Sequence, residues 1–164
     1  MDSITPDPHL DPVDLRILER LQVDASMSND ALARAVHTSA ATCLRRVKRL
    51  VESGIVERRV ALLSPERLGA SLTAIVEVTL DRQSAEALSA FEARAVADDA
   101  VRQCHRVSSG PDFILVVQAA EMPAYDALVQ RLFTADANVR NIKSFFSVHR
   151  AKFDTRSLLP APAR

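Results

Sequence analysis

Apolar positions in the first third of the chain recur at the spacing of three and four residues that is typical of amphipathic helices. Asp11 can cap a first helix that has Pro12 at its first position and runs to about Gln22. The apolar stripe of this helix consists of Ile17, Leu18 and Leu21. A stripe of this kind must pack against other helices, so a small helical unit is expected here.

Two further helices follow around a tight turn, and serines mark the start of each one. Ser28 and Ser39 are suited to cap helices over Asn29 to Val36 and Ala40 to Ser53, with His37-Thr38 as the turn. Gly54 ends the second of them, because glycine adopts the left-handed backbone that follows many helices. The buried stripe of this longer helix is expected to be Leu44, Val47, Leu50 and Val51. Short helices around a tight turn are typical of a helix-turn-helix DNA-binding motif.

The remainder of the chain alternates between strand-like and helix-like segments. Residues 55–63 are expected to form a strand that leads out of the helical unit, until Pro65 and Gly69 interrupt it. Next come segments predicted as strand 72–80, helix 84–96, strand 101–107, strand 113–119, helix 123–133 and strand 139–148. This order predicts a ferredoxin-like antiparallel sheet with both helices on one side and strand 113–119 in a central position.

The fold class is therefore α+β, with a winged-type helix-turn-helix domain and a ferredoxin-like domain joined by a strand linker. The expected boundaries are residues 1–61 for the helical domain, 62–69 for the linker, 70–152 for the ferredoxin-like domain and 153–164 for a C-terminal tail. Residues 1–9 are expected to be disordered.

Composition excludes several other classes of protein. The chain has 164 residues, 48% of them hydrophobic, with 21 basic and 21 acidic side chains. No apolar run is long enough to span a bilayer, so we expect a cytoplasmic protein. The two cysteines and three glycines form neither a CxxC motif nor a phosphate loop. Cys104 and His105 would point to opposite faces of a strand. We therefore expect no enzyme, no cofactor and no bound metal.

Basic charge is concentrated around the second helix of the motif. Residues 34–59 contain seven basic and two acidic side chains in a chain whose net charge is zero. Such a patch favours phosphate binding, although basic residues on a helix are often only a solvated surface. As DNA contacts we expect Ser39, Ala41, Thr42 and Arg45 in the major groove and Arg46, Lys48, Arg49 and Arg58 on phosphates.

One face of the predicted sheet has no helix to cover it. Ile75, residues of the 113–119 strand and either Phe145 or Phe146 would form an apolar surface there. A second copy of the same sheet is the simplest cover, and a homodimer would place two helix-turn-helix units on a palindromic DNA site.

Several motifs in the chain resemble the Lrp/AsnC family of transcription regulators. They are Leu10-Asp11-Pro12-Val13-Asp14-Leu15-Arg16-Ile17-Leu18, Cys43-Leu44-Arg45-Arg46-Val47-Lys48-Arg49-Leu50, Gly54-Ile55-Val56, Leu62-Leu63-Ser64-Pro65, Leu68-Gly69, Cys104-His105-Arg106-Val107-Ser108 and Asp112-Phe113. The resemblance runs from about Leu10 to Lys152 and implies dimers that assemble into tetramers or octamers. It also implies an amino acid or related effector near the turn after the second ferredoxin strand.

The effector site that this resemblance implies consists of Ser109, Gly110, Pro111, Asp112 and Ser144. In that turn the family usually has Gly-Asp-x-Asp-aromatic, and here only the last acidic residue and the aromatic residue match. The strand that often carries Thr-x-Thr has Ile142-Lys143-Ser144. An alternative role for Asp112 is that of a turn residue that caps its own backbone.

These observations predict a sequence-specific, homo-oligomeric DNA-binding regulator that responds to an amino acid or related metabolite. A second interpretation is an architectural DNA-binding regulator whose ligand site is degenerate. A third is a metabolite-binding module in which the helical unit is only a scaffold and does not bind DNA.

Overall fold

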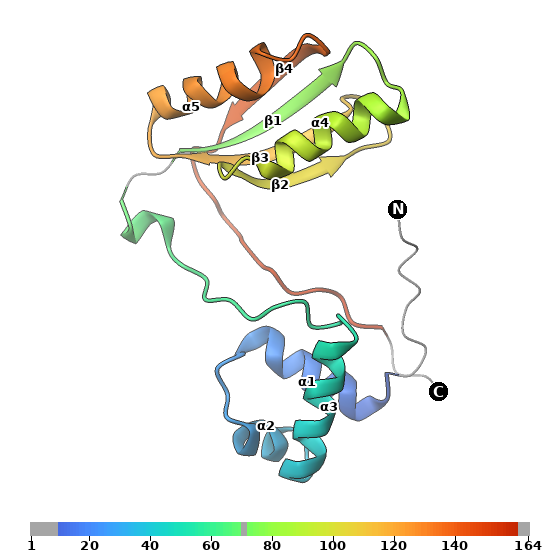
Figure 1. Cartoon of the computed structure of the whole chain (residues 1–164). Helices are drawn as coiled ribbons and strands as arrows, with labels where there is room; N and C mark the ends of the chain where they lie inside the picture. Colours follow the sequence, from blue (N-terminus) through green and yellow to red (C-terminus); the bar gives the residue numbers. More distant parts are fainter. Residues whose placement is uncertain (1–9, 70–71, 161–164) are drawn as a thin grey trace. The chain divides into compact units, whose positions relative to one another are not determined.

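The computed structural model describes residues 10–69 and 72–160, which separate into two compact units. One unit extends to Leu62 and takes in the chain again from Lys152, and the other is Leu63–Ala151. The first contains only helices and the second contains a sheet with helices (Figure 1). The expected disorder of residues 1–9 falls outside the described residues. No described helix is long and apolar enough to cross a membrane.

The helical unit begins with α1 (Pro12–Val23), whose start is fixed by a capping box. Oδ1 of Asp11 accepts hydrogen bonds from the backbone N–H groups of Val13 and Asp14 at 2.8 and 3.0 Å. The Asp14 side chain in turn accepts the Asp11 N–H, so both carboxylates satisfy donors that the first helical turn leaves free. Ile17 and Leu18 point into the core of the unit, as the sequence predicts.

Helices α2 (Asn29–Ala35) and α3 (Ala40–Glu52) confirm the predicted helix pair, including both caps. Ser28 and Ser39 each accept a hydrogen bond from the backbone N–H three residues later. His37 in the turn adopts a φ of 56°, and Gly54 after α3 adopts a φ of 76°. The N–H of Val56 reaches back to the carbonyl of Leu50, which closes the end of α3.

One prediction about this region is wrong in part, and a second is wrong. Cys43 and Leu50 are fully buried on α3, whereas Leu44 and Val51 are 60% and 46% exposed. Val47 and Leu50 of the predicted stripe do pack in the core, and Cys43 takes the core position that was expected for Leu44. The expected strand at residues 55–63 does not form either, since no described segment pairs with this stretch. A strand requires a hydrogen-bonded neighbour.

The second unit is a four-stranded antiparallel sheet with the strand order β2-β3-β1-β4. This order confirms the ferredoxin-like prediction and places β3 beside β1 in the centre. The strands are β1 (Leu72–Leu80), β2 (Val101–Arg106), β3 (Phe113–Ala119) and β4 (Val139–Phe146), and the helices are α4 (Ala85–Ala97) and α5 (Met122–Leu128). A π-helical segment, Val129–Thr134, extends α5, and a short 3₁₀ turn, Pro65–Arg67, precedes β1.

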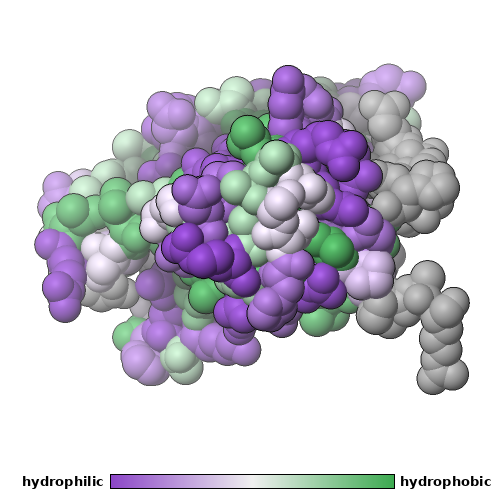
Figure 2. Space-filling model, turned by 90° about the horizontal axis from the view of Figure 1, so that it is seen from below, coloured by the Kyte–Doolittle hydropathy of each residue, from purple (hydrophilic) through white to green (hydrophobic). Residues whose placement is uncertain are grey.

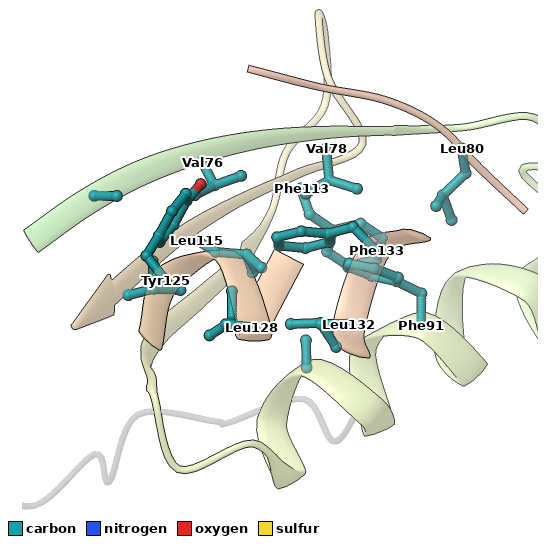
Figure 3. Close-up of a cluster of buried hydrophobic side chains, with 13 residues drawn as sticks. Val76, Val78, Leu80, Phe91, Phe113, Leu115, Tyr125, Leu128, Leu132 and Phe133 are labelled. Atoms are coloured by element: carbon teal, nitrogen blue, oxygen red, sulfur yellow. The ribbon is translucent and has the colours of Figure 1, made fainter. Parts of the chain in front are cut away.

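Both helices of this unit lie on the same side of the sheet, and the core lies between them and the strands (Figure 3). Phe91 of α4 and Phe113 of β3 are 0% exposed, with ring centroids 4.8 Å apart. Burial alternates along β1, where Val76 and Val78 face the helices. The intervening residues of β1 therefore face the opposite side of the sheet, which no helix of the described chain covers.

Candidate DNA-binding surface and ligand cavity

A fully buried carboxylate, Asp14, joins α1 to α3 in the helical unit. Its Oδ1 accepts a hydrogen bond from Nη1 of Arg46 at 2.9 Å, and its Oδ2 accepts one from Nη2 of Arg49 at 2.5 Å. The same Nη1 of Arg46 donates to Oδ2 of Asp11 at 2.5 Å. Two of the cations expected on phosphates are therefore held by acidic side chains of the first helix.

The pKa values at this junction reflect the same contacts. Burial of Asp11 acts to raise its pKa, but the N–H groups of Asp14 and Val13 and the guanidinium of Arg46 outweigh it and lower the pKa below the usual aspartate value. Hydrogen bonds to Asp11 and Asp14 raise the pKa of Arg46. Because the folded pKa of Asp11 is lowered, its contribution to stability is present above the ordinary value of about 3.9. That contribution is lost as the pH falls through the lowered pKa.

The other predicted DNA contacts divide into capping residues and exposed residues. The hydroxyl of Ser39 accepts the N–H of Thr42 and donates to its Oγ1 at 2.9 Å, so both residues shape the start of α3. Ala41 and Arg45 are exposed on the outer face, and no ion pair among the described residues engages Arg45. Lys48 is also exposed, and its ammonium lies 3.7 Å from the Glu52 carboxylate.

A groove runs between α3 and the segment that follows it. Its volume is about 460 Å³, and Lys48, Val51, Glu52, Val56, Glu57, Arg58 and Arg59 line it. Lys48 and Arg58 were expected to contact phosphates, and here they lie in one groove together with Arg59. Sequence reasoning missed Arg59, although its place in the basic stretch was a signal for it. The groove thus brings three cations together with two carboxylates, Glu52 and Glu57.

Leu44 is a second surface residue that sequence reasoning missed. It precedes Arg45 on α3 and is 60% exposed. The molecular face seen in Figure 2 is mostly hydrophilic and carries separate hydrophobic patches. Counting Cys43 as a core residue would have moved the predicted stripe and exposed Leu44. The outer face of α3 therefore presents a cation beside an aliphatic side chain.

A cavity of about 290 Å³ lies on the side of the sheet that the helices leave uncovered. It is lined by Glu77, Thr79, Gly110, Pro111, Asn141 and Lys143. Glu77 and Thr79 of β1 lie opposite Lys143 and Asn141 of β4 in the strand register. Gly110 and Pro111 were expected at an effector site, whereas the four strand residues were not. The alternation of side chains along β1 could have indicated Glu77 and Thr79, because it places both on the face of the sheet that the helices do not cover.

The remaining expected effector residues are placed elsewhere. Oδ2 of Asp112 accepts the backbone N–H of Leu80 at 2.7 Å, so this carboxylate holds the turn on the end of β1 rather than capping its own backbone. The Ser144 hydroxyl is hydrogen-bonded to the hydroxyl of Tyr125, which belongs to the buried core on the helix side. Ser144 thus lies on the face opposite the cavity, and Ser109 is exposed in the turn without lining it.

An apolar row crosses the same uncovered face of the sheet. Ile75 of β1 lies between Val116 of β3 and Phe145 of β4 in the register. Ile75 and Phe145 are 44% and 52% exposed. Phe146 instead contacts the Tyr125 ring edge-on, with centroids 5.1 Å apart. Of the two phenylalanines considered from the sequence, Phe145 is therefore the one on the uncovered face.

Side chains suited to metal binding or thiol chemistry are sparse among the described residues. Among the residues that the structure describes, no three His, Cys, Asp or Glu side chains could hold a metal ion. Burial raises the pKa of the Cys104 thiol, which disfavours the reactive thiolate. His105, the next residue along β2, contacts the Gln103 side chain through Nε2 at 3.1 Å.

Comparison with known proteins gives matches over both units. Residues 73–157 match the family model described as the Lrp/AsnC ligand binding domain, and residues 10–57 match a winged helix-turn-helix DNA-binding model. An uncharacterized HTH-type transcriptional regulator of Haemophilus influenzae is 37% identical over 92% of this chain and 89% of its own length.

Solved structures agree with these matches. An AsnC family transcriptional regulator from Agrobacterium tumefaciens is 32% identical, with a TM-score of 0.82 over 92% of this chain and 96% of the other. A transcriptional regulator from Neisseria meningitidis, solved as a complex with L-methionine, is 31% identical. The TM-score of this match is 0.82, and the match covers 90% of the present chain and 95% of the Neisseria meningitidis chain.

Proposed function

The chain belongs to the Lrp/AsnC family of DNA-binding transcriptional regulators, and from that premise we propose how it binds DNA and what regulates it. A cytoplasmic homodimer, able to assemble into tetramers or octamers, reads a palindromic operator through α3. An amino acid or related metabolite binds the cavity on the uncovered face of the sheet. The domain that ends at residue 61 binds DNA. Residues 62–69 link it to the ligand-binding and oligomerisation domain at residues 70–152.

The observation that carries the DNA assignment is the separation of cations on α3 into two groups. Arg46 and Arg49 are paired with Asp14 and hold α3 against α1. Arg45 and Lys48 are exposed on the outer side of the helix. In the proposed complex Ala41, Leu44 and Arg45 face base edges, while Lys48, Arg58 and Arg59 contact phosphates.

Replacing Arg45 with alanine is expected to weaken operator binding without loss of stability. A bidentate arginine-guanine contact contributes ~1–3 kcal/mol, and a dimer presents two, so the affinity should fall roughly thirtyfold or more. Fluorescence anisotropy with a selected operator measures this loss, and thermal unfolding checks the fold. Arg16→Ala removes an exposed cation of α1 and is the matched control. Equal affinity of the two variants would contradict the assignment of Arg45.

Replacing Leu44 with alanine tests whether its exposed side chain contacts thymine methyl groups. Burying one methyl is worth ~0.8 kcal/mol, so contacts in two half-sites predict about a tenfold loss of affinity. Operators in which single thymines are replaced by deoxyuridine lack that methyl. Wild type should lose affinity at one such position in each half-site, whereas the Leu44→Ala variant should lose nothing further there. Equal losses for both proteins at every position would exclude the contact.

The charges of the cavity support an α-amino acid as the ligand. Glu77 and Lys143 face each other across β1 and β4, and both side chains line the space. The Glu77 carboxylate suits an α-ammonium group, and the Lys143 ammonium suits an α-carboxylate. A volume of about 290 Å³ is near the lower end of small-molecule sites. This pair of charges supplies the recognition that the altered turn at Ser109 no longer offers.

Replacing Lys143 with methionine is expected to reduce amino-acid affinity at least tenfold, because it removes the carboxylate partner while keeping the side-chain length. Isothermal titration with a panel of the common amino acids provides the measurement. Arg140→Met on the same strand is the control, since Arg140 does not line the cavity. Unchanged binding by the Lys143→Met variant would remove Lys143 from the site.

An architectural regulator with a degenerate ligand site is the second candidate, and the changed residues at Ser109 and Gly110 favour it. The same titrations separate the two candidates. If wild type gives no heat with any amino acid and no change in oligomer size, the effector proposal is wrong and the architectural function is the better one.

A further inference from the structure

The C-terminal segment after β4 belongs to the helical unit rather than to the sheet unit that precedes it. β4 ends at Phe146, and the described chain continues to residue 160 without a helix or strand. From Lys152 onward this segment is part of the same compact unit as α1, α2 and α3. The sequence alone predicts only a C-terminal tail for residues 153–164.

Two contacts attach the segment to the helical unit. The backbone N–H of Ser157 donates a hydrogen bond to Oε1 of Gln22, near the end of α1, at 2.5 Å. Leu159 is partly buried and packs on the hydrophobic core of the three helices. The neighbouring Leu158 is fully exposed. Two adjacent leucines in extended chain thus point to opposite sides, one to the core and one to solvent.

The same segment continues the strand that carries the proposed ligand and dimer contacts. Asn141 and Lys143 of β4 line the cavity, and Phe145 belongs to the apolar row. Only residues 147–151 separate the end of this strand from the segment that belongs to the helical unit. Each protomer therefore has two chain connections between its units, one before β1 and one after β4.

We propose that residues 152–160 dock on the helical core and thereby act as a clamp, by which we mean a second chain connection that limits the movement of the helical unit. The C-terminal segment is then a fourth element of the DNA-binding unit, beside α1, α2 and α3. Its binding surface lies on the helical core beside Gln22, and its occupant is this chain's own Ser157–Leu159. A second connection restricts the orientations that the helical unit samples. In a dimer this restriction raises the effective concentration of the second helical unit at its half-site. This role rests on the proposed function as a dimeric DNA reader.

The docking itself is tested without DNA by Leu159→Asp and the matched control Leu158→Asp in the full chain. A carboxylate at position 159 cannot enter the apolar core, whereas one at position 158 remains in water. Trypsin cleavage after Arg156, followed by mass spectrometry, should be at least tenfold faster for Leu159→Asp than for wild type. Leu158→Asp should match wild type. Equal cleavage rates for the two variants would overturn the docking.

The clamp role is tested by binding to an operator with two half-sites and to a single half-site. Leu159→Asp should lose about tenfold on the two-site operator and nothing on the half-site. Gln22→Ala, which leaves the core intact, should show the same pattern with a smaller loss. Unchanged two-site binding, or equal losses on both DNAs, would overturn the clamp. If wild type bound no DNA, the proposed function would fail while the trypsin result would still decide the docking.

Discussion

Asp14→Ala is expected to destabilise the helical unit by about 3 kcal/mol and to weaken operator binding while the sheet unit stays folded. The substitution removes the only side chain that pairs with both Arg46 and Arg49 in the described structure, and it breaks the capping box of α1. Removing one member of a buried ion pair costs 3–5 kcal/mol, and because both arginines retain access to water we expect about 3 kcal/mol. A small domain with a stability of ~5 kcal/mol would lose most of it.

Thermal unfolding of the full chain is followed by circular dichroism at 222 nm, to which helices of both units contribute, and the destabilised helical unit should give an earlier transition than in wild type. Asp30→Ala is the matched control, because Asp30 is an exposed carboxylate in the first turn of α2. Asp14→Asn keeps the shape and the hydrogen-bond acceptor and should fall between the two. If Asp14→Ala and Asp30→Ala unfolded at the same temperature, the junction would not hold the unit together.

Phe145→Asp is expected to convert the proposed dimer into a monomer of 18.0 kDa. Phe145 is 52% exposed beside Ile75 in the apolar row, and a second copy of the sheet would cover that row. A two-fold interface would bury the introduced carboxylate twice without a partner, so dimer affinity should fall at least a hundredfold. Operator affinity should fall roughly a hundredfold as well, because the two helical units no longer bind as one molecule.

Sedimentation velocity measures the mass of this variant, and anisotropy measures its affinity for the operator. Val96→Asp on α4 is the control, since Val96 is 67% exposed but lies on a helix rather than on the uncovered face of the sheet. A Phe145→Asp variant that sedimented like Val96→Asp would show that another surface forms the oligomer.

Elements with a strong local pattern could be predicted from the sequence. Strand β1 has apolar residues at every second position along its whole length, and β3 is apolar almost throughout, so the first and last residues of both strands were predicted correctly. The caps of α2 and α3 were found because serine is a preferred N-cap residue directly in front of an amphipathic helix. Such signals need only a few neighbouring residues, so they are visible without the fold.

Contacts between distant segments were the part that the sequence did not reveal. Arg46 and Arg49 are separated from Asp14 by more than thirty residues, and their basic character alone indicated phosphate binding. The role of Asp112 also depends on a distant residue, because its carboxylate accepts the backbone N–H of Leu80 at the end of β1. The cavity also depends on the pairing of β1 with β4, which brings Glu77 opposite Lys143 only once the sheet has formed.

The hydrogen bond from Leu80 to Asp112 has a consequence for how the cavity can change over evolution. Asp112 is committed to holding the turn, and the adjacent Phe113 is 0% exposed in the core, so substitution of either residue would cost the fold. Ser109 is exposed and Pro111 lines the cavity, so both can vary while the rim stays in place. At the proposed ligand site, residues in the first half of the turn can therefore change while the second half keeps the fold of the turn constant.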